Sequence, residues 1–200
     1  MGTTVGFEKF TEFEQALSKY TGAPYVVLTD CCTHAVELCL RLQKTGIVTL
    51  PYKSYISIPM TMHKLNIDYH YDKIEWTYEY RIGLTNIWDS ARGFDKDMYR
   101  AGQMQCLSFG HSKRLQIGHG GAILTNNKED ANTLRRMAYD GRDLSITPWQ
   151  KQETFYVGYH YKPSIEDCEK GIYMLANNEL KTKESQQVNY PDLTKIKITN

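Results

Sequence analysis

The stretch "LSFGHSKRLQIGHGGAILTNN", residues 107–127, decides how this chain folds and where its chemistry lies. It begins and ends in apolar runs that are typical of buried strands. Between these runs lies a short polar segment with one lysine, Lys113, and with Ser108 at its start. Three glycines follow that suit a positive φ or close backbone approach: Gly118, Gly120 and Gly121. A surface lysine needs no such neighbours, so Lys113 is a candidate for covalent chemistry.

Outward from this stretch, short apolar runs alternate with segments of helical spacing. The predicted strands are residues 25–29, 47–51, 67–71, 85–89, 105–109 and 121–125. The predicted helices are residues 7–20, 33–44, 54–65, 128–139 and 164–177. This alternation predicts an α/β fold with three layers (α/β/α) and a mostly parallel central sheet.

Two connections and the C-terminal segment depart from that pattern. Residues 72–84 and 90–104 are too short for crossover helices, so at least one of them should be a compact loop, a hairpin or an edge strand. From residue 178 onward the sequence turns polar and loses its periodicity. We therefore expect one α/β domain over residues 1–177 and a polar tail over residues 178–200 that lies against another surface.

The composition excludes several classes of protein. The 200 residues include 24 basic and 23 acidic side chains, a formal net charge of +1. This balance argues against nucleic-acid binding, because no basic stripe is present to neutralise phosphates. No apolar run reaches the roughly 18 residues of a membrane span, and the first residues lack the apolar core of a signal peptide. We expect a cytoplasmic protein that binds no membrane.

The cysteines point to a reducing compartment rather than to disulfides. There are five of them, an odd number, and they form no CxxC pair. Cys31, Cys32 and His34 could form a metal site, but zinc ligands favour spaced pairs and a fourth ligand is missing. We predict free thiols and no metal.

Polar residues follow the first predicted strand, at the end where ligands lie in open α/β sheets. A helix is expected to begin there near Thr33 and His34, and its free N–H groups would bind an anion. The alternative is that Asp30 or Thr33 merely caps this helix.

Two further strand ends carry an aromatic ring and an acid. Tyr55 lies beyond strand 47–51, where it can stack on a flat ligand. Asp89 ends strand 85–89, and a buried carboxylate is costly there unless it pairs with a cation or accepts hydrogen bonds. An ion pair between Asp89 and Arg92 is the simpler alternative.

Together these residues form the set that pyridoxal 5′-phosphate (PLP) needs. That set is a phosphate cradle, a ring stack, a carboxylate on the pyridine nitrogen and a lysine on the aldehyde. Lys113 can serve as this lysine only where its surroundings favour the neutral amine, because a protonated amine is no nucleophile. The nucleotide-binding motifs GxxxxGK[ST] and GxGxxG are both absent from the sequence.

At these residues the chain resembles the DegT/DnrJ/StrS sugar aminotransferases, a family of fold-type I PLP enzymes. The resemblance runs from about residue 10 to about residue 177. Its most specific part is the family pattern SFxxxKxxxxGxGGxxxT, which matches Ser108 through Lys113 to Thr125. The other matches are residues 30–34, 50–55, 88–92 and "GYHYKPSIED" at 158–167.

The resemblance implies roles for the residues that would surround the ring. Lys113 would be the Schiff-base lysine, and Asp89 would pair with the pyridine nitrogen. Tyr55 would stack on the ring. Arg92 stands near the 3-oxygen of the cofactor, where family members carry glutamine or histidine.

Other residues would hold the phosphate. Thr33 and Ser108 match family contacts, and His34 replaces a small residue in the same turn. His160 replaces an asparagine that reaches the phosphate of the neighbouring subunit. The resemblance therefore implies a homodimer with a shared active site.

The chain is shorter than most family members. The resemblance implies that it is cut in the region of residues 72–84, and we expect it to lack the C-terminal domain with which family members help to hold the substrate. The resemblance implies a minimal PLP-dependent aminotransferase. It would move an amino group from an amino acid, expected to be glutamate, to a keto group of a nucleotide-linked sugar, as in polysaccharide and lipopolysaccharide biosynthesis.

Three other functions stay open. A PLP-dependent sugar dehydratase of the same family would carry histidine where Lys113 stands. A PLP enzyme for another amine or amino acid would want an arginine clamp for an α-carboxylate, for which Arg92 or Arg142 could be proposed. A degenerate member would act as a binding or assembly subunit, although the expected lysine, aspartate and hydroxyl residues are all present.

Overall fold

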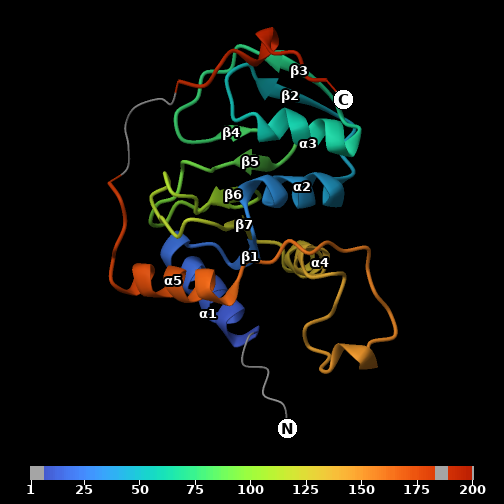
Figure 1. Ribbon diagram of the computed structural model, residues 1–200, viewed down its shortest axis with the longest axis vertical. Helices are drawn as coiled ribbons and strands as arrows, with labels where there is room; N and C mark the ends of the chain where they lie inside the picture. Colours follow the sequence, from blue (N-terminus) through green and yellow to red (C-terminus); the bar gives the residue numbers. More distant parts are fainter. Residues whose placement is uncertain (1–6, 183–188, 200) are drawn as a thin grey trace.

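The computed structural model describes residues 7–182 and 189–199 and confirms the predicted α/β class. Its central layer is a five-stranded sheet in the order β1-β7-β6-β5-β4 (Figure 1). These strands span Tyr25–Thr29 (β1), Tyr80–Arg81 (β4), Ile87–Asp89 (β5), Met104–Ser108 (β6) and Gly121–Thr125 (β7). A second, two-stranded sheet pairs β2 (Ile47–Pro51) in parallel with β3 (Asp68–Asp72).

The strand directions place three carboxyl ends at one edge of the sheet. β7 runs antiparallel to both of its neighbours, β1 and β6, and β5 runs parallel to β6. Hence β1, β5 and β6 all point the same way, and the residues that follow them meet at one edge. The sheet is mixed, because β7 and the edge strand β4 run against the strands beside them.

Helices cover both faces of the sheet. They span Phe7–Thr21 (α1), Cys32–Gln43 (α2), Ser57–Leu65 (α3), Lys128–Ala138 (α4) and Ile165–Ala176 (α5). α2 packs against β1, β5, β6 and β7, with α3 and α4 as its neighbours, while α1 packs against β1 and α5. Figure 1 shows α2, α3 and α4 on one side of the sheet and α1 and α5 on the other. Two short 3-10 helices, Trp149–Lys151 (η1) and Leu193–Lys195 (η2), complete the described elements.

The core forms where apolar spacing meets the sheet. The strands β1 and β7 are buried over almost their whole length. In α1, Phe10, Phe13 and Leu17 are buried, as their helical spacing predicts. Gly171 lets α5 approach α1, because a Cβ atom there would lie 2.4 Å from Cζ of Phe13. In the described part of the chain, no helix is both long enough and apolar enough to cross a membrane.

Both short connections avoid a crossover helix, as expected. Residues 72–84 contain the two-residue strand β4, which forms an antiparallel pair with β5. The N–H of Gly83 then donates to the carbonyl of Thr49 at 2.9 Å and joins the two sheets. Residues 90–103 form turns and irregular loop without a helix or strand, although β5 and β6 are parallel neighbours.

Candidate functional site

A cavity of about 570 Å³ opens where β1, β5 and β6 end. Six of the eight side chains that the sequence predicted for the site line it: Thr33, Tyr55, Asp89, Arg92, Ser108 and Lys113. They come from segments up to 80 residues apart in the chain, and sheet topology brings them together. Its volume falls within the range of about 300–1,000 Å³ that is typical of small-molecule sites.

The loop that carries Lys113 is closed by backbone hydrogen bonds at both ends. Phe109 N–H donates to the carbonyl of Gly120 at 3.0 Å, and Gly118 N–H donates to that of Phe109 at 2.9 Å. Gly118 and Gly120 have φ angles of +114° and +112°, a region that L side chains rarely adopt.

Gly121 serves a different purpose in the same loop. A Cβ atom there would lie 2.6 Å from the backbone of Cys31 and Cys32. The glycine therefore lets β7 pass directly beneath the turn that opens α2. Both predicted uses of the glycine cluster, positive φ and close approach, are confirmed.

Asp89 is a buried carboxylate with three donors. Its Oδ2 accepts the hydroxyl of Tyr80 at 2.8 Å, and its Oδ1 accepts the N–H of Ala91 at 3.1 Å. The thiol of Cys32 lies 3.9 Å from Oδ1. Burial raises the pKa of Asp89, and the hydrogen bonds from Tyr80 and Ala91 together with the charge of Lys113 oppose that rise. Burial raises the pKa of Tyr80 well above its ordinary value, so its phenol remains a donor.

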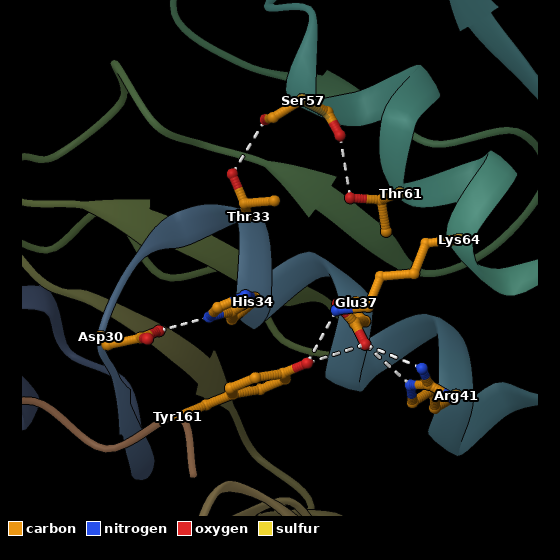
Figure 2. A network of polar contacts seen from close by, with 9 residues as sticks. All are labelled: Asp30, Thr33, His34, Glu37, Arg41, Ser57, Thr61, Lys64 and Tyr161. Carbon is orange, nitrogen blue, oxygen red and sulfur yellow. Dashed lines mark hydrogen bonds and ion pairs between the residues drawn. The ribbon is translucent and has the colours of Figure 1, made fainter. Parts of the chain in front are cut away.

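The start of α2 is open to an anion. Its N-cap is Cys31, in an extended conformation and without a side-chain capping bond in the described structure. The hydroxyl of Thr33 donates to Oγ of Ser57 at 2.8 Å (Figure 2), and Asp30 binds His34. The alternative that Asp30 or Thr33 caps the helix is therefore wrong, and the first N–H groups of α2 are left for a ligand.

His34 faces away from the cavity. Its Nδ1 lies 2.6 Å from Oδ1 of Asp30, and its ring stacks on Tyr161 with 3.7 Å between centroids (Figure 2). Burial acts to lower the pKa of His34, but hydrogen bonds with Asp30 and Cys31 outweigh it and raise the pKa to about 9. The structure thus places His34 in the first turn of α2 but not among the residues that line the cavity.

Next to His34, a buried carboxylate gathers three partners. Glu37 on α2 is 1% exposed and bonds Arg41 and Lys64, each at 2.9 Å. It also accepts the hydroxyl of Tyr161 at 3.2 Å (Figure 2). Burial would raise the pKa of Glu37, but its bonds with Lys64 and Arg41 outweigh burial and lower it. This network fixes Tyr161, and with it residues 158–162, against α2.

Comparison with known proteins agrees with this geometry. Residues 2–68 and 78–177 match the DegT/DnrJ/EryC1/StrS aminotransferase family. The chain belongs to that family. No curated protein matches the sequence significantly.

Aminotransferases of known structure share the fold. Sugar aminotransferase CalS13 from Micromonospora echinospora is 14% identical, with a TM-score of 0.66 over 84% of this chain and 61% of that one. Aminotransferase TlmJ from Streptoalloteichus hindustanus is 17% identical, with a TM-score of 0.68 over 84% and 58%. NtdA from Bacillus subtilis, solved with bound cofactor PMP, is 19% identical, with a TM-score of 0.66 over 84% and 47%. The chain therefore spans between 47% and 61% of the length of these three structures.

The structure places the remaining predicted site residue, His160, at the surface. Its side chain is 70% exposed, and its Nδ1 lies 3.0 Å from Asp140. Arg142, 3.8 Å from the same carboxylate, is likewise outside the residues that line the cavity. Asp30, Cys31 and His34 have ligand atoms within 4.8 Å of one another, whereas Cys32 points to Asp89 instead.

Sequence reasoning missed several lining residues of this family member. Ser57 opens α3 and meets Thr33, and only its place just after a strand end could have suggested it. Trp76 lies in the short 72–84 connection, and Lys181 and Tyr190 lie in the C-terminal segment. These last three residues occur in stretches without periodicity, where the sequence gives no sign of which side chains turn inward.

Proposed function

We propose that this protein is a PLP-dependent aminotransferase of the cytoplasm. It moves an amino group from an amino-acid donor, expected to be glutamate, to a keto group of a nucleotide-linked sugar. The convergence of Thr33, Asp89, Ser108 and Lys113 on one cavity carries the proposal. All five cysteines are free, which supports a reducing compartment.

The lining residues at the start of α2 and near it fit the phosphate of the cofactor. The uncapped N–H groups of α2 and the helix dipole favour an anion there. The hydroxyls of Thr33, Ser57 and Ser108 line the same cavity and can donate to phosphate oxygens. The backbone of β7 passes close beneath this turn, so the cradle has a rigid floor.

Asp89, Tyr55 and Lys113, which line the same cavity, fit the ring and the aldehyde. Bound PLP supplies an aldehyde that takes up the donor's amine and a ring that withdraws electrons. Asp89, held by Tyr80 and Ala91, would keep a proton on the ring nitrogen. Tyr55 would pack on the ring. The Nζ atom of Lys113 would hold the aldehyde and, once displaced by the donor's amine, carry a proton to and from the substrate carbon.

We further propose that the protein acts as a homodimer with a shared active site. His160 is exposed, and it lies beside a projecting segment, residues 141–158, that carries apolar side chains into solvent: Ile146, Trp149, Phe155, Tyr156 and Val157. A monomer rarely leaves such a group uncovered. A second copy of the chain covering it would bring His160 toward the neighbouring cavity. Light scattering of the purified protein tests this, and a monomer would contradict it.

The first experiment on the enzyme is an absorbance spectrum of the protein with added PLP, before and after borohydride, for wild type, Lys113→Ala and Lys19→Ala. Lys19 is an exposed lysine in α1 and serves as the matched control. We expect a visible band that borohydride fixes to wild type and to Lys19→Ala but not to Lys113→Ala. Bleaching of the band by glutamate supports transamination.

The same spectrum distinguishes the enzyme from one rival function. A degenerate, non-catalytic member would fold but show no band, and this result would refute the enzyme proposal. The survival of Asp89 with its full set of donors argues against that outcome, because a buried carboxylate without a function is a cost to stability.

A further inference from the structure

The C-terminal segment is held on the protein beside the cavity at two points. The first lies just after α5, where the backbone N–H of Lys181 donates to the carbonyl of Arg114 at 2.9 Å. The Nζ of Lys181 donates to the carbonyl of His111 at 3.0 Å. Both acceptors belong to the loop that carries Lys113, so Lys181 is fixed to the rim of the site.

The second point lies beyond β2. The N–H of Leu193 donates to the carbonyl of Tyr52 at 2.8 Å, and its side chain is only 2% exposed. Figure 1 shows this end of the chain, with η2, beside β2 and β3, far from α5. Lys181 and Leu193 therefore hold the segment against the domain at two separate places.

Between these points the segment contributes an aromatic ring to the cavity. Tyr190 stacks on Trp76, with ring centroids 5.6 Å apart and planes 24° apart. Trp76 is itself fixed, because its Nε1 donates to the carbonyl of Lys53 at 2.8 Å and its ring packs 4.8 Å from that of Tyr80. Burial raises the pKa of Tyr190, and the charge of Asp89 adds to the rise. The ring is therefore a neutral, fixed face near the proposed catalytic carboxylate.

The cavity also carries more positive charge than a single cofactor needs. Among the described lining residues there are four cations, Arg92, Lys113, Arg114 and Lys181, against one carboxylate, Asp89. Arg114 pairs with Asp95, and Lys113 is assigned to the aldehyde. A phosphate monoester carries about −1.5 to −2 charges at pH 7. The proposed function already assigns the cofactor's phosphate to the N-terminus of α2. Lys181, bound to the loop that carries Lys113, adds a cation that fits a second anionic group.

We infer that Tyr190 and Lys181 form the binding site for the nucleotide part of the acceptor. The Tyr190 ring, which packs on Trp76 with one face, stacks with its other face on the flat base of a nucleoside diphosphate, and Lys181 pairs with the phosphates. This inference rests on the proposed function, because it names the residues that hold the acceptor of that reaction. The C-terminal segment then supplies the substrate contacts for the cavity.

The test is calorimetric titration of UDP, dTDP, GDP and CDP into PLP-treated protein, with the absorbance band recorded on the same samples. Wild type should bind at least one of them at concentrations up to about 1 mM. Tyr190→Ala should weaken this binding about tenfold or more, because a base loses its stacking partner. Tyr190→Phe keeps the ring and should stay within about twofold of wild type.

Two further variants test the charged contact and provide a control. Lys181→Gln should weaken binding about fivefold and make it less sensitive to salt, because one charged contact is lost. Tyr173→Ala, a change at a 58% exposed ring on α5, is the matched control and should bind like wild type. Should Tyr190→Ala melt at a lower temperature than wild type, Lys181→Gln compared with Tyr173→Ala still decides the question.

The outcomes separate the inference from the proposed function. Absence of the PLP band would overturn the proposed function whatever the nucleotides do. A normal band with no nucleotide binding, or with binding that is unchanged in Tyr190→Ala and Lys181→Gln, would overturn the inference alone. A normal band with binding that depends on both side chains would support it.

Discussion

Thr33 and His34 are neighbours in the first turn of α2, yet they belong to two different regions of the molecule. Thr33 lines the cavity and bonds Ser57. His34 lies on the other side of the helix, in a network with Asp30 and Tyr161 (Figure 2). Successive helix residues point about 100° apart, so one turn of helix serves both a ligand and the scaffold. We therefore expect that ligand binding and stability can be changed separately here.

The largest effect should be on stability, and it should come from the hydrogen-bond network around Glu37. Glu37→Ala removes a carboxylate that is 1% exposed and that bonds Arg41 and Lys64. We expect the free energy of unfolding to fall by about 2–3 kcal/mol, because partners that remain part-buried lose their acceptor. Urea denaturation measures this loss. The control is Glu12→Ala, at the exposed ion pair with Lys9, which should leave the free energy of unfolding almost unchanged. Equal losses in both variants would show that the network adds nothing.

The second largest effect should be on cofactor binding, and it should come from Tyr80, which supports Asp89 in the cavity. Tyr80→Phe removes the hydroxyl that donates to Oδ2 of Asp89 at 2.8 Å. Burial already raises the pKa of Asp89, and without this donor the pKa should rise further. We expect PLP affinity near neutral pH to fall about tenfold, and its loss on acidification should begin at a higher pH than in wild type. Absorbance titrations at several pH values measure both.

A matched variant checks that the Tyr80 effect is local. Tyr99 donates to Asn126, away from the residues that line the cavity. Tyr99→Phe should therefore leave PLP affinity and its pH dependence unchanged. An equal shift in both variants would count against a specific role for Tyr80.

A smaller effect should distinguish two threonines that both contact Ser57. Thr33→Val removes the hydroxyl in the cavity and should weaken PLP binding about fivefold. Thr61 donates to the backbone carbonyl of Ser57 at 2.9 Å and does not line the cavity, so Thr61→Val should leave PLP binding unchanged. Identical affinities in the two variants would mean that Thr33 makes no contact with the phosphate.

The smallest effect should be a pH dependence of the free energy of unfolding that comes from His34. The pKa of His34 is raised to about 9 by its partners, against about 6.5 in the unfolded chain. Its stabilisation is therefore complete below about pH 6.5 and is lost as the pH rises through about 9. We expect wild type to exceed His34→Gln by about 1 kcal/mol at pH 6 and by almost nothing at pH 10. A constant difference across this range in denaturation experiments would refute the charge-based explanation.

The elements with strong periodicity could be predicted from sequence, and those without it could not. Strands β1, β2 and β7 have the bounds expected from their apolar runs. The helix expected from residue 54 begins at Ser57 instead, because nothing in the local spacing fixes where the first turn starts. β4 has two residues, too few for any alternation.

The site shows the same division. Residues at strand ends, such as Asp89 and Ser108, follow from the topology rule for α/β sheets. His34 was expected at the phosphate because of its position next to Thr33, but its direction depends on the helical register and on Tyr161, more than 120 residues away in the chain. Tyr190 is an isolated aromatic residue in a polar stretch, and only tertiary packing against Trp76 places it.

The cavity is assembled from distant parts of the chain, and this has a thermodynamic consequence. Thr33, Asp89 and Lys113 come together only when the whole sheet has formed, so an unfolded or half-folded chain offers no binding site. A ligand that binds only the native state raises the free energy of unfolding by an amount that grows with its concentration, about 2.7 kcal/mol at one hundred times its Kd. The melting temperature would then report how much of the protein is loaded, and supply of the cofactor would govern how long the protein survives in a cell.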